Sequence, residues 1–153
     1  MKRTIRDLNN IEGKRILLRC DFNVPLDNFG DIMDSSRIVA SLPTIEYLAK
    51  KGAKLIICSH LGRPKGYDKY LSLFPVAVYL MKYFPNRVKF CNKVIGPVVD
   101  KAVSQMKNGD ILVLENLRFM EGEEKNDPKF VDQLAKLADI YVDDAFGVAH
   151  RKH

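Results

Sequence analysis

The sequence predicts a doubly wound, Rossmann-like α/β fold, a three-layer α/β/α lobe built around a parallel sheet of about five strands. Short, nearly continuous apolar runs alternate along the chain with segments in which apolar residues recur at helical spacing. Apolar runs without polar alternation are typical of strands buried on both faces, as in a parallel sheet. Parallel neighbours must be joined by crossovers, which the intervening helices supply. The length of 153 residues suits one such domain and is too short for two.

The first two strands and the helix between them are the clearest elements. Residues 15–20 and 53–58 form apolar runs. Between them, the polar residues at 34–37 are typical of a helix entry, and Gly52 is typical of the residue that follows a helix end. Pro43 lies inside this helical segment, so we expect it either to kink the helix or to mark its true start.

The rest of the chain continues the same alternation. Each strand–helix–strand step predicts a right-handed crossover, which places helices on both faces of the sheet. Asp127 followed by Pro128 is a helix cap with proline in the first turn. The remaining elements are a helix at 73–84, a strand at 87–91, a helix from 96 to 108, a strand at 111–114, a helix from 127 to 138 and a strand at 140–142.

Composition places the chain among globular proteins. Hydrophobic residues make up 46% and charged residues 29%, which excludes disorder and low-complexity structure. No apolar run approaches 18 residues and no apolar signal segment begins the chain, so neither a membrane span nor a secretory signal is expected. Cys20, Cys58 and Cys91 lie in or beside apolar runs, which predicts reduced core residues in a cytoplasmic protein, with a catalytic cysteine as the alternative.

Unusual polar residues follow the predicted strands at one edge of the sheet. They occupy positions 21–23 after the first strand, 59–63 after the second, 115–118 after the fourth, and 143–144 with 150–151 after the fifth. Ligands of open α/β sheets bind in the crevice at this edge, where the parallel strands end. The predicted helix start at 34–37 can reach the same edge. The candidate anion-binding side chains are therefore Arg37, His60, Arg63, Arg118 and Arg151.

This set of side chains predicts a compact anion that carries both a phosphate and a carboxylate. The formal net charge of +6 favours an anionic partner, and no nucleic-acid-binding signature accompanies it, so no nucleic acid is expected. The guanidinium fork matches both anionic groups. A phosphate carries about −1.5 to −2 at neutral pH, so an added carboxylate brings the ligand to about −2.5 to −3. Asp21 would then accept a hydrogen bond from a ligand hydroxyl or orient a neighbouring arginine.

The candidate residues also have plainer interpretations. Asp21 and Asn23 are consistent with a simple turn after a strand, and His60 is consistent with a loop cap. Gly62 and Gly66 indicate only turns, because no glycine motif of a phosphate-binding loop is present.

The acidic residues near the same edge do not predict a metal site. Glu121, Glu123 and Glu124 have no histidine or cysteine at ligand spacing, so a solvated loop face is expected. Asp143 and Asp144 favour cap or arginine-orienting roles, with metal binding as the alternative.

Four segments of the chain resemble, in the same order, signature motifs of the phosphoglycerate kinase family. The first is ILLRCDFNVP at 16–25, the second SHLGRP at 59–64, the third LENLRF at 114–119 and the fourth DAFGVAHR at 144–151. The sequence LPTI at 42–45 also matches, so the internal proline is a family feature. The four motifs span nearly the whole chain, which makes the resemblance highly specific.

The resemblance implies a glycolytic phosphotransferase that moves a phosphoryl group reversibly between 1,3-bisphosphoglycerate with ADP and 3-phosphoglycerate with ATP. It also implies two lobes joined by a hinge, an N-terminal lobe for the phosphoglycerate and a C-terminal lobe for the nucleotide and its Mg²⁺. By motif match, Arg37 is the catalytic residue, associated with the transferred phosphoryl group. The matched phosphoglycerate-binding residues are Asp21, Phe22, Asn23, Arg37, His60, Leu61, Gly62, Arg63, Arg118 and Arg151.

The same resemblance implies that residues 1–153 form a single N-terminal phosphoglycerate-binding domain and that the nucleotide-binding domain is absent. Since phosphoryl transfer needs its donor held in line by that second lobe, we expect the chain alone to be inactive. Complete family members are expected to be monomers, whereas a lobe without the family's final edge strand is expected to be prone to self-association. The alternatives are a non-enzymatic anion-binding module and a structural fragment.

Three positions depart from the family pattern. Cys20 stands where valine is frequent, Asp143 where asparagine is usual, and Lys152 where a small residue is usual. The first is a conservative core change, whereas the other two add charge close to the matched site.

Overall fold

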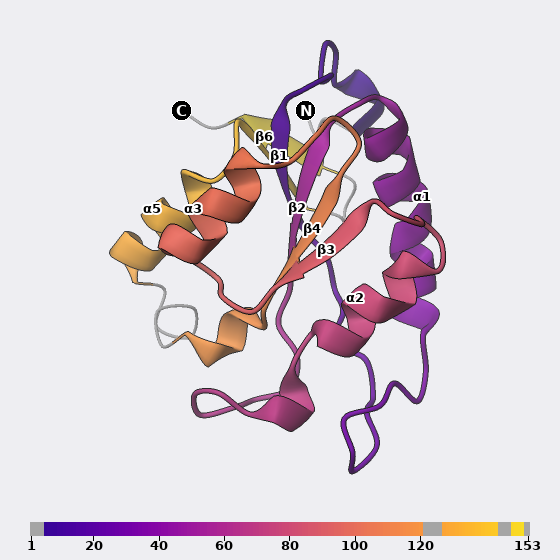
Figure 1. Ribbon diagram of the computed structural model, residues 1–153, viewed down its shortest axis with the longest axis vertical. Coiled ribbons are helices and arrows are strands. Elements are labelled where there is room, and N and C mark those ends of the chain that lie inside the picture. The colour runs from indigo at the N-terminus through magenta and orange to yellow at the C-terminus, as the bar shows by residue number, and fades with distance from the viewer. Residues whose placement is uncertain (1–4, 121–126, 144–147, 152–153) are drawn as a thin grey trace.

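The computed structural model describes residues 5–120, 127–143 and 148–151, and a six-stranded sheet runs through it in the order β3-β4-β2-β1-β5-β6 (Figure 1). The strands are β1 Arg15–Arg19, β2 Lys54–Cys58, β3 Val88–Cys91, β4 Ile111–Leu114, β5 Ile140–Asp143 and β6 Val148–Arg151. The first five strands pair in parallel, as the sequence predicts, and β6 pairs antiparallel with β5.

Helices cover both faces of this sheet. The helices α1 (Ser36–Lys50) and α2 (Phe74–Met81) lie on one face, and α3 (Pro97–Ser104) and α5 (Pro128–Ala135) lie on the other (Figure 1). Three short 3-10 helices complete the described elements, η1 Ile5–Asp7, η2 Lys69–Leu71 and η3 Leu117–Phe119. The arrangement confirms the predicted three-layer, doubly wound α/β fold.

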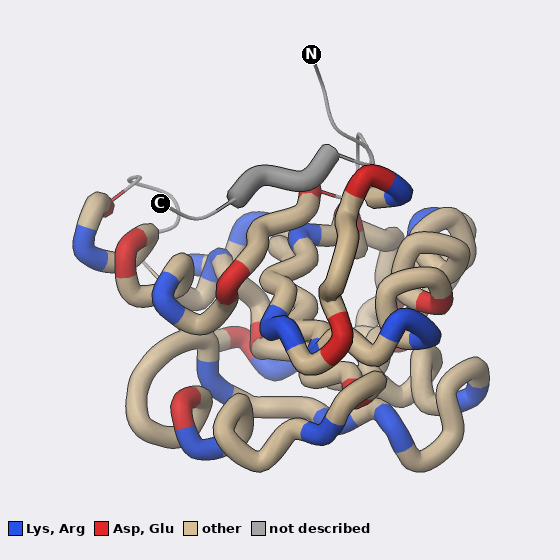
Figure 2. Tube along the Cα trace, turned by 90° about the horizontal axis from the view of Figure 1, so that it is seen from above, with Lys and Arg blue, Asp and Glu red and all other residues tan. Residues whose placement is uncertain are grey.

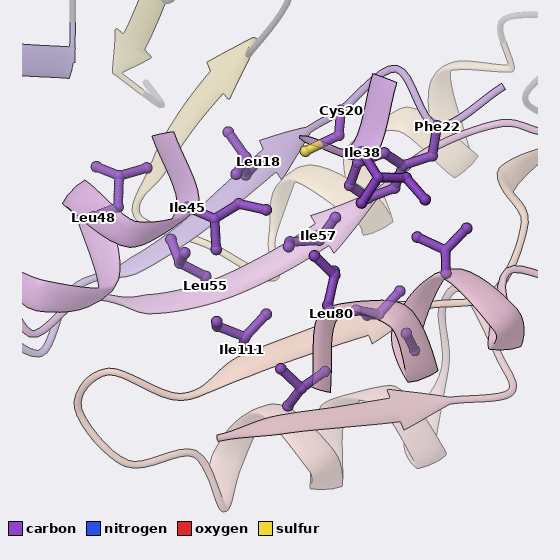
Figure 3. Close-up of a cluster of buried hydrophobic side chains, with 14 of the residues drawn as sticks. Leu18, Cys20, Phe22, Ile38, Ile45, Leu48, Leu55, Ile57, Leu80 and Ile111 are labelled. Carbon is purple, nitrogen blue, oxygen red and sulfur yellow. The ribbon is translucent and has the colours of Figure 1, made fainter. Parts of the chain in front are cut away.

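Side chains alternate along each central strand, so each strand contributes to two cores. On β2, Leu55 and Ile57 face the core beneath α1 and α2, whereas Ile56 and Cys58 face the core beneath α3 and α5. Figure 3 shows the first of these cores, in which helix side chains such as Leu80 meet the strands. Burial on both faces explains why the strands read as continuous apolar runs.

Helix α1 runs through Pro43 without interruption, so the alternative that the helix starts at this proline is wrong. Proline has no N–H to donate to the preceding turn, and the buried contacts of Ile45 and Leu48 offset that loss. Gly52 follows the helix end as predicted. Its φ is +86°, and a β-carbon there would lie 2.9 Å from Glu12 Cγ, so a side chain would be both strained and crowded.

The antiparallel strand β6 is a feature that the sequence does not predict. Its four residues carry no alternation, and its pairing depends on β5 instead of on a local pattern. It returns along β5 with Val148 opposite Asp143 and Arg151 opposite Ile140. The polar residue Asp144 and the rest of 144–147 lie outside the described residues, as do Glu121, Glu123, Glu124 and Lys152.

The three cysteines are free and buried, as predicted. Cys20 lies in the core beneath α1 and α2, and Cys58 and Cys91 lie in the opposite core. Apolar surroundings of this kind are typical of structural cysteines and not of reactive ones.

An ion pair ties together the amino-terminal ends of β1 and β5. The Arg15 backbone N–H donates to Asp139 Oδ2 at 3.0 Å, and the Arg15 side-chain Nη2 donates to Asp139 Oδ1 at 3.2 Å. The Asp139 N–H donates in return to the Arg15 carbonyl at 2.8 Å. The hydrogen bond from the Arg15 side chain holds the pKa of the Asp139 carboxyl below its ordinary value.

We expect Asp139→Asn to lower the free energy of unfolding at pH 7 by less than about 1 kcal/mol, since both side chains are about 40% exposed to solvent. Because the folded-state pKa is lowered, this stabilisation is present above the unfolded pKa and is lost as the pH falls through the folded value. Urea titrations of both proteins between pH 7 and pH 2 should show the difference shrinking below about pH 5. A difference that stays constant over this range would contradict the assignment.

We expect Leu55→Ala to destabilise the domain by about 2 to 5 kcal/mol, because the side chain is fully buried in the central strand β2 and the substitution leaves a cavity. Urea unfolding monitored by circular dichroism measures the loss. The matched control is Val131→Ala on α5, where the side chain is 49% exposed and the change should stay within about 0.5 kcal/mol. Equal losses for the two variants would contradict the placement of the core.

Candidate anion-binding site

The candidate site lies where β1, β2 and β4 end. These strands are parallel and in register, with Arg19 opposite Cys58 and Ile57 opposite Val113, so their exit loops begin at one edge. The chain after β2 leads to α2 on one face of the sheet, whereas the chain after β4 leads to α5 on the other face (Figure 1). Adjacent strands whose connections leave to opposite faces form a switch point, which is where open α/β sheets bind ligands.

A hydrogen-bonded network joins four of the predicted site residues. Arg37, in the first turn of α1, donates from Nη1 to Asp21 Oδ1 at 3.1 Å and to the Asn23 carbonyl at 2.9 Å. The Asn23 side chain accepts a hydrogen bond from the Gly62 N–H at 2.9 Å. The loops after β1 and β2 and the start of α1 therefore meet, as the sequence predicts.

Asp21 orients Arg37, which is one of the two roles expected for it. Both side chains are about half exposed, so the pair contributes little to stability. Its effect, together with the Asn23 carbonyl, is to fix the direction of the guanidinium group. Asp21 also accepts a hydrogen bond from the Asn23 N–H at 3.2 Å, so the turn interpretation of this segment holds as well.

Two further arginines at this edge, Arg63 and Arg118, have unused donors. Arg63 is exposed, and its guanidinium has no hydrogen-bond or ion-pair partner within the described ranges. Arg118, in η3, is half-buried, and its buried Nε has no partner in the same part of the chain. A buried donor without a partner is costly, so an anion that accepts its hydrogen would relieve that cost.

Two matched residues contribute only their backbone to this edge. The side chains of Phe22 and Leu61 are buried in the core beneath α1 and α2 (Figure 3 shows Phe22). A ligand at the edge would meet the main chain of either residue and not the side chain. Gly62 beside them has a φ of +62°, and a β-carbon there would lie 3.0 Å from Leu71 Cδ2.

His60 and Arg151 are the remaining predicted site residues, and they lie in different places. His60 is half-buried between Ser59 and Leu61 at the end of β2. Arg151 was expected at the carboxyl edge, but β6 turns back along β5 and places its backbone opposite Ile140, where β5 begins. The structure therefore does not bring the Arg151 backbone to the other candidates.

Three buried polar residues at this edge received no role from the sequence alone. Ser59 follows β2 directly, and Glu115 and Asn116 follow β4 directly, and each is less than 5% exposed. A glutamate and an asparagine placed immediately after a four-residue apolar strand are the signal that could have found them, because polar groups are buried only when they have partners.

Two cavities open at this edge of the sheet, and the first of them borders the network. One of about 400 Å³ is lined by Asn23, Gly62 and Tyr70 among others. The other, of about 640 Å³, is a groove with Phe29 and Phe74 in its walls. Figure 2 shows Lys and Arg distributed among Asp and Glu around the visible trace, so the positive excess is not one continuous stripe.

Within the described ranges, no group of three His, Cys, Asp or Glu residues could hold a metal ion. In the same ranges, no helix is both long enough and apolar enough to cross a membrane.

The fold and this edge define the class of the protein, a doubly wound α/β protein with arginines in the segments that meet at a switch point. Residues 5–153 match the family model described as phosphoglycerate kinase. The chain belongs to the phosphoglycerate kinase family.

The relatives support the assignment over part of their length only. The chain is 54% identical to a phosphoglycerate kinase of Dictyoglomus turgidum, covering 99% of this chain and 39% of that protein. It is 51% identical to one from Aquifex aeolicus, covering 99% and 38%. The phosphoglycerate kinase structure from Coxiella burnetii superposes with a TM-score of 0.80 at 33% identity, covering 94% of this chain and 35% of that one. The chain thus spans about two-fifths of the length of these relatives.

Proposed function

We propose that this chain supplies the phosphoglycerate-binding half of a phosphoglycerate kinase. The observation that carries the proposal is the meeting of two loops with the start of α1, where Asp21 orients Arg37 and Asn23 holds the Gly62 N–H. In the complete enzyme, the reaction is the reversible transfer of a phosphoryl group between 1,3-bisphosphoglycerate with ADP and 3-phosphoglycerate with ATP.

The proposed roles follow from charge. The phosphate and carboxylate of 3-phosphoglycerate together carry about −2.5 to −3 at neutral pH, which suits several guanidinium groups partly out of water. Arg63 and Arg118, with unused donors, bind the anionic ends of the ligand. Arg37 stabilises the charge on the transferred phosphoryl group, because phosphoryl transfer relies on positioning and electrostatics.

We propose no nucleotide or metal contact for this chain. The Mg²⁺ complex of ADP or ATP is proposed to bind the part of the complete enzyme that this chain does not span. The chain alone is therefore proposed to bind phosphoglycerate and to catalyse nothing. Free buried cysteines favour a reducing, cytoplasmic location.

The second candidate function is a non-enzymatic anion-binding module. The same guanidinium groups favour it, and the two candidates differ in affinity. A module that works alone needs tight binding, whereas a half-site that normally closes against a second lobe binds weakly by itself.

We expect isothermal titration of the chain with 3-phosphoglycerate to show weak binding that falls as salt is raised. Arg63→Ala should reduce the affinity about tenfold or more, because it removes charge-assisted hydrogen bonds. The matched control is Arg87→Ala, an exposed arginine before β3 at the opposite edge, which should change the affinity by less than about twofold. Absence of heat with millimolar 3-phosphoglycerate would refute the half-site, and tight binding would favour the anion-binding module.

We expect a coupled kinase assay with 1,3-bisphosphoglycerate and MgADP to show no turnover by the isolated chain, because nothing holds the nucleotide in line. An Arg37→Ala variant purified in parallel identifies contamination, since turnover that persists in it does not arise from this site. Turnover by the wild-type chain that Arg37→Ala abolishes would contradict the proposed inactivity.

A further inference from the structure

Most of the buried polar side chains in the described part of this protein lie together where β2 and β4 end. The described residues include four buried polar or charged ones, Ser41, Ser59, Glu115 and Asn116. All but Ser41 lie at the carboxyl ends of β2 and β4, where the two strands part. Buried polar groups are costly unless they are fully paired, so this concentration calls for a structural reason.

The side chain of Asn116 uses its full hydrogen-bonding capacity. Its Oδ1 accepts from the N–H groups of Leu61 at 3.1 Å and Arg118 at 3.0 Å. Its Nδ2 donates to the carbonyls of Leu61 at 2.7 Å and Leu71 at 2.9 Å. The residue is fully buried, so its two bonds to Leu61 are shielded from water, and those to Leu71 and Arg118 are partly buried.

The carboxylate of Glu115 accepts three more hydrogen bonds at the same place. Its Oε1 accepts from the backbone N–H groups of Leu73 at 2.9 Å and Asn116 at 2.8 Å. Its Oε2 accepts from the Ser72 hydroxyl at 2.7 Å. Two of these three donors, the Ser72 hydroxyl and the Leu73 N–H, lie directly before α2, where a helix N-terminus favours an anion.

These bonds close the loop that leaves β2. Asn116 holds Leu61 at one end of the loop and Leu71 at the other, and Glu115 holds the next two residues. The segment between those ends carries Arg63. Gly62, directly after the clamped Leu61, donates to Asn23, whose carbonyl accepts from Arg37. A continuous set of contacts thus runs from Asn116 to the guanidinium of Arg37.

We propose that Asn116 and Glu115 are positioning residues that hold the loop at 61–73 in its anion-binding conformation, with Asn116 setting the place of the Gly62 N–H and of Arg63. The inference rests on the proposed function for its ligand, 3-phosphoglycerate. Neither side chain touches the ligand, because both are buried, so both act through the backbone that they fix.

The decisive variant is Asn116→Asp, which keeps the size of the side chain and replaces its amide donor by a carboxylate oxygen. That oxygen would face the Leu61 and Leu71 carbonyls, so two attractive contacts become repulsive. We expect amide hydrogen exchange at Leu61 and Gly62 to accelerate about tenfold or more relative to amides of β2 and β4. The affinity for 3-phosphoglycerate should fall about tenfold. A purely structural defect would instead raise exchange in the strands to the same extent.

The matched control is Asn92→Asp, which adds the same charge at an exposed asparagine after β3, near the same edge of the sheet. It should leave exchange at Leu61 unchanged and lower the affinity by less than about twofold. Equal effects of the two variants would overturn the inference, because the added negative charge alone would then explain the loss of affinity and of loop protection.

A second pair of variants covers the case in which Asn116→Asp does not fold. Glu115→Gln keeps an oxygen for the Leu73 and Asn116 N–H groups, and its amide can donate to the Ser72 hydroxyl oxygen, so it should preserve both loop protection and binding. Glu115→Ala should lose both. Indistinguishable exchange and affinity for these two variants would contradict the inference.

The experiments distinguish a failure of the proposed function from a failure of the positioning role. If the wild-type chain does not bind millimolar 3-phosphoglycerate, the proposed function fails. The exchange comparison alone then decides whether Asn116 holds the loop at 61–73. If the wild type binds and Asn116→Asp binds equally well with unchanged loop exchange, the function stands and the positioning role is refuted.

Discussion

The geometry of the candidate site depends on one constraint, the parting of β2 and β4 at their carboxyl ends. Beyond the ladder pair of Ile57 and Val113, the two chains lead to opposite faces of the sheet. Backbone groups that leave a ladder inside a protein must find new partners. Ser59 and Asn116 supply them across the gap, since the Ser59 carbonyl accepts from the Leu117 N–H and Asn116 pairs with Leu61. The polar residues in this interior are therefore a requirement of the topology.

The two kinds of polar contact at this edge differ in strength and in purpose. The Asp21–Arg37 pair is half exposed, and pairs of this type contribute about 0.2 to 1 kcal/mol. Loss of a partner by a buried amide costs about 1 to 3 kcal/mol for each group left unpaired. The conformation of the loop is therefore set by the buried Asn116, and the exposed pair only directs a guanidinium that remains open to solvent.

Much of the fold could be predicted because its signals are local. The continuous apolar runs that became β1 and β2 follow from burial on both faces, and Gly52 ends α1 through its own positive φ. Two features could not be predicted in this way. The strand β6 pairs antiparallel with β5 at the edge of the sheet, and α1 continues through Pro43 because tertiary packing outweighs a lost hydrogen bond.

The residues of the site also divide into those that a local pattern predicts and those that depend on tertiary packing. Polar residues after apolar runs identify the edge and with it Asp21 and Asn23, and the predicted helix start at 34–37 adds Arg37. The burial of Phe22 depends on tertiary packing, and the hydrogen bond from Asn116 to Leu61 spans 55 residues, so no local pattern contains either. The contacts that order the proposed half-site therefore join segments that are far apart in the sequence and become neighbours only in the folded sheet.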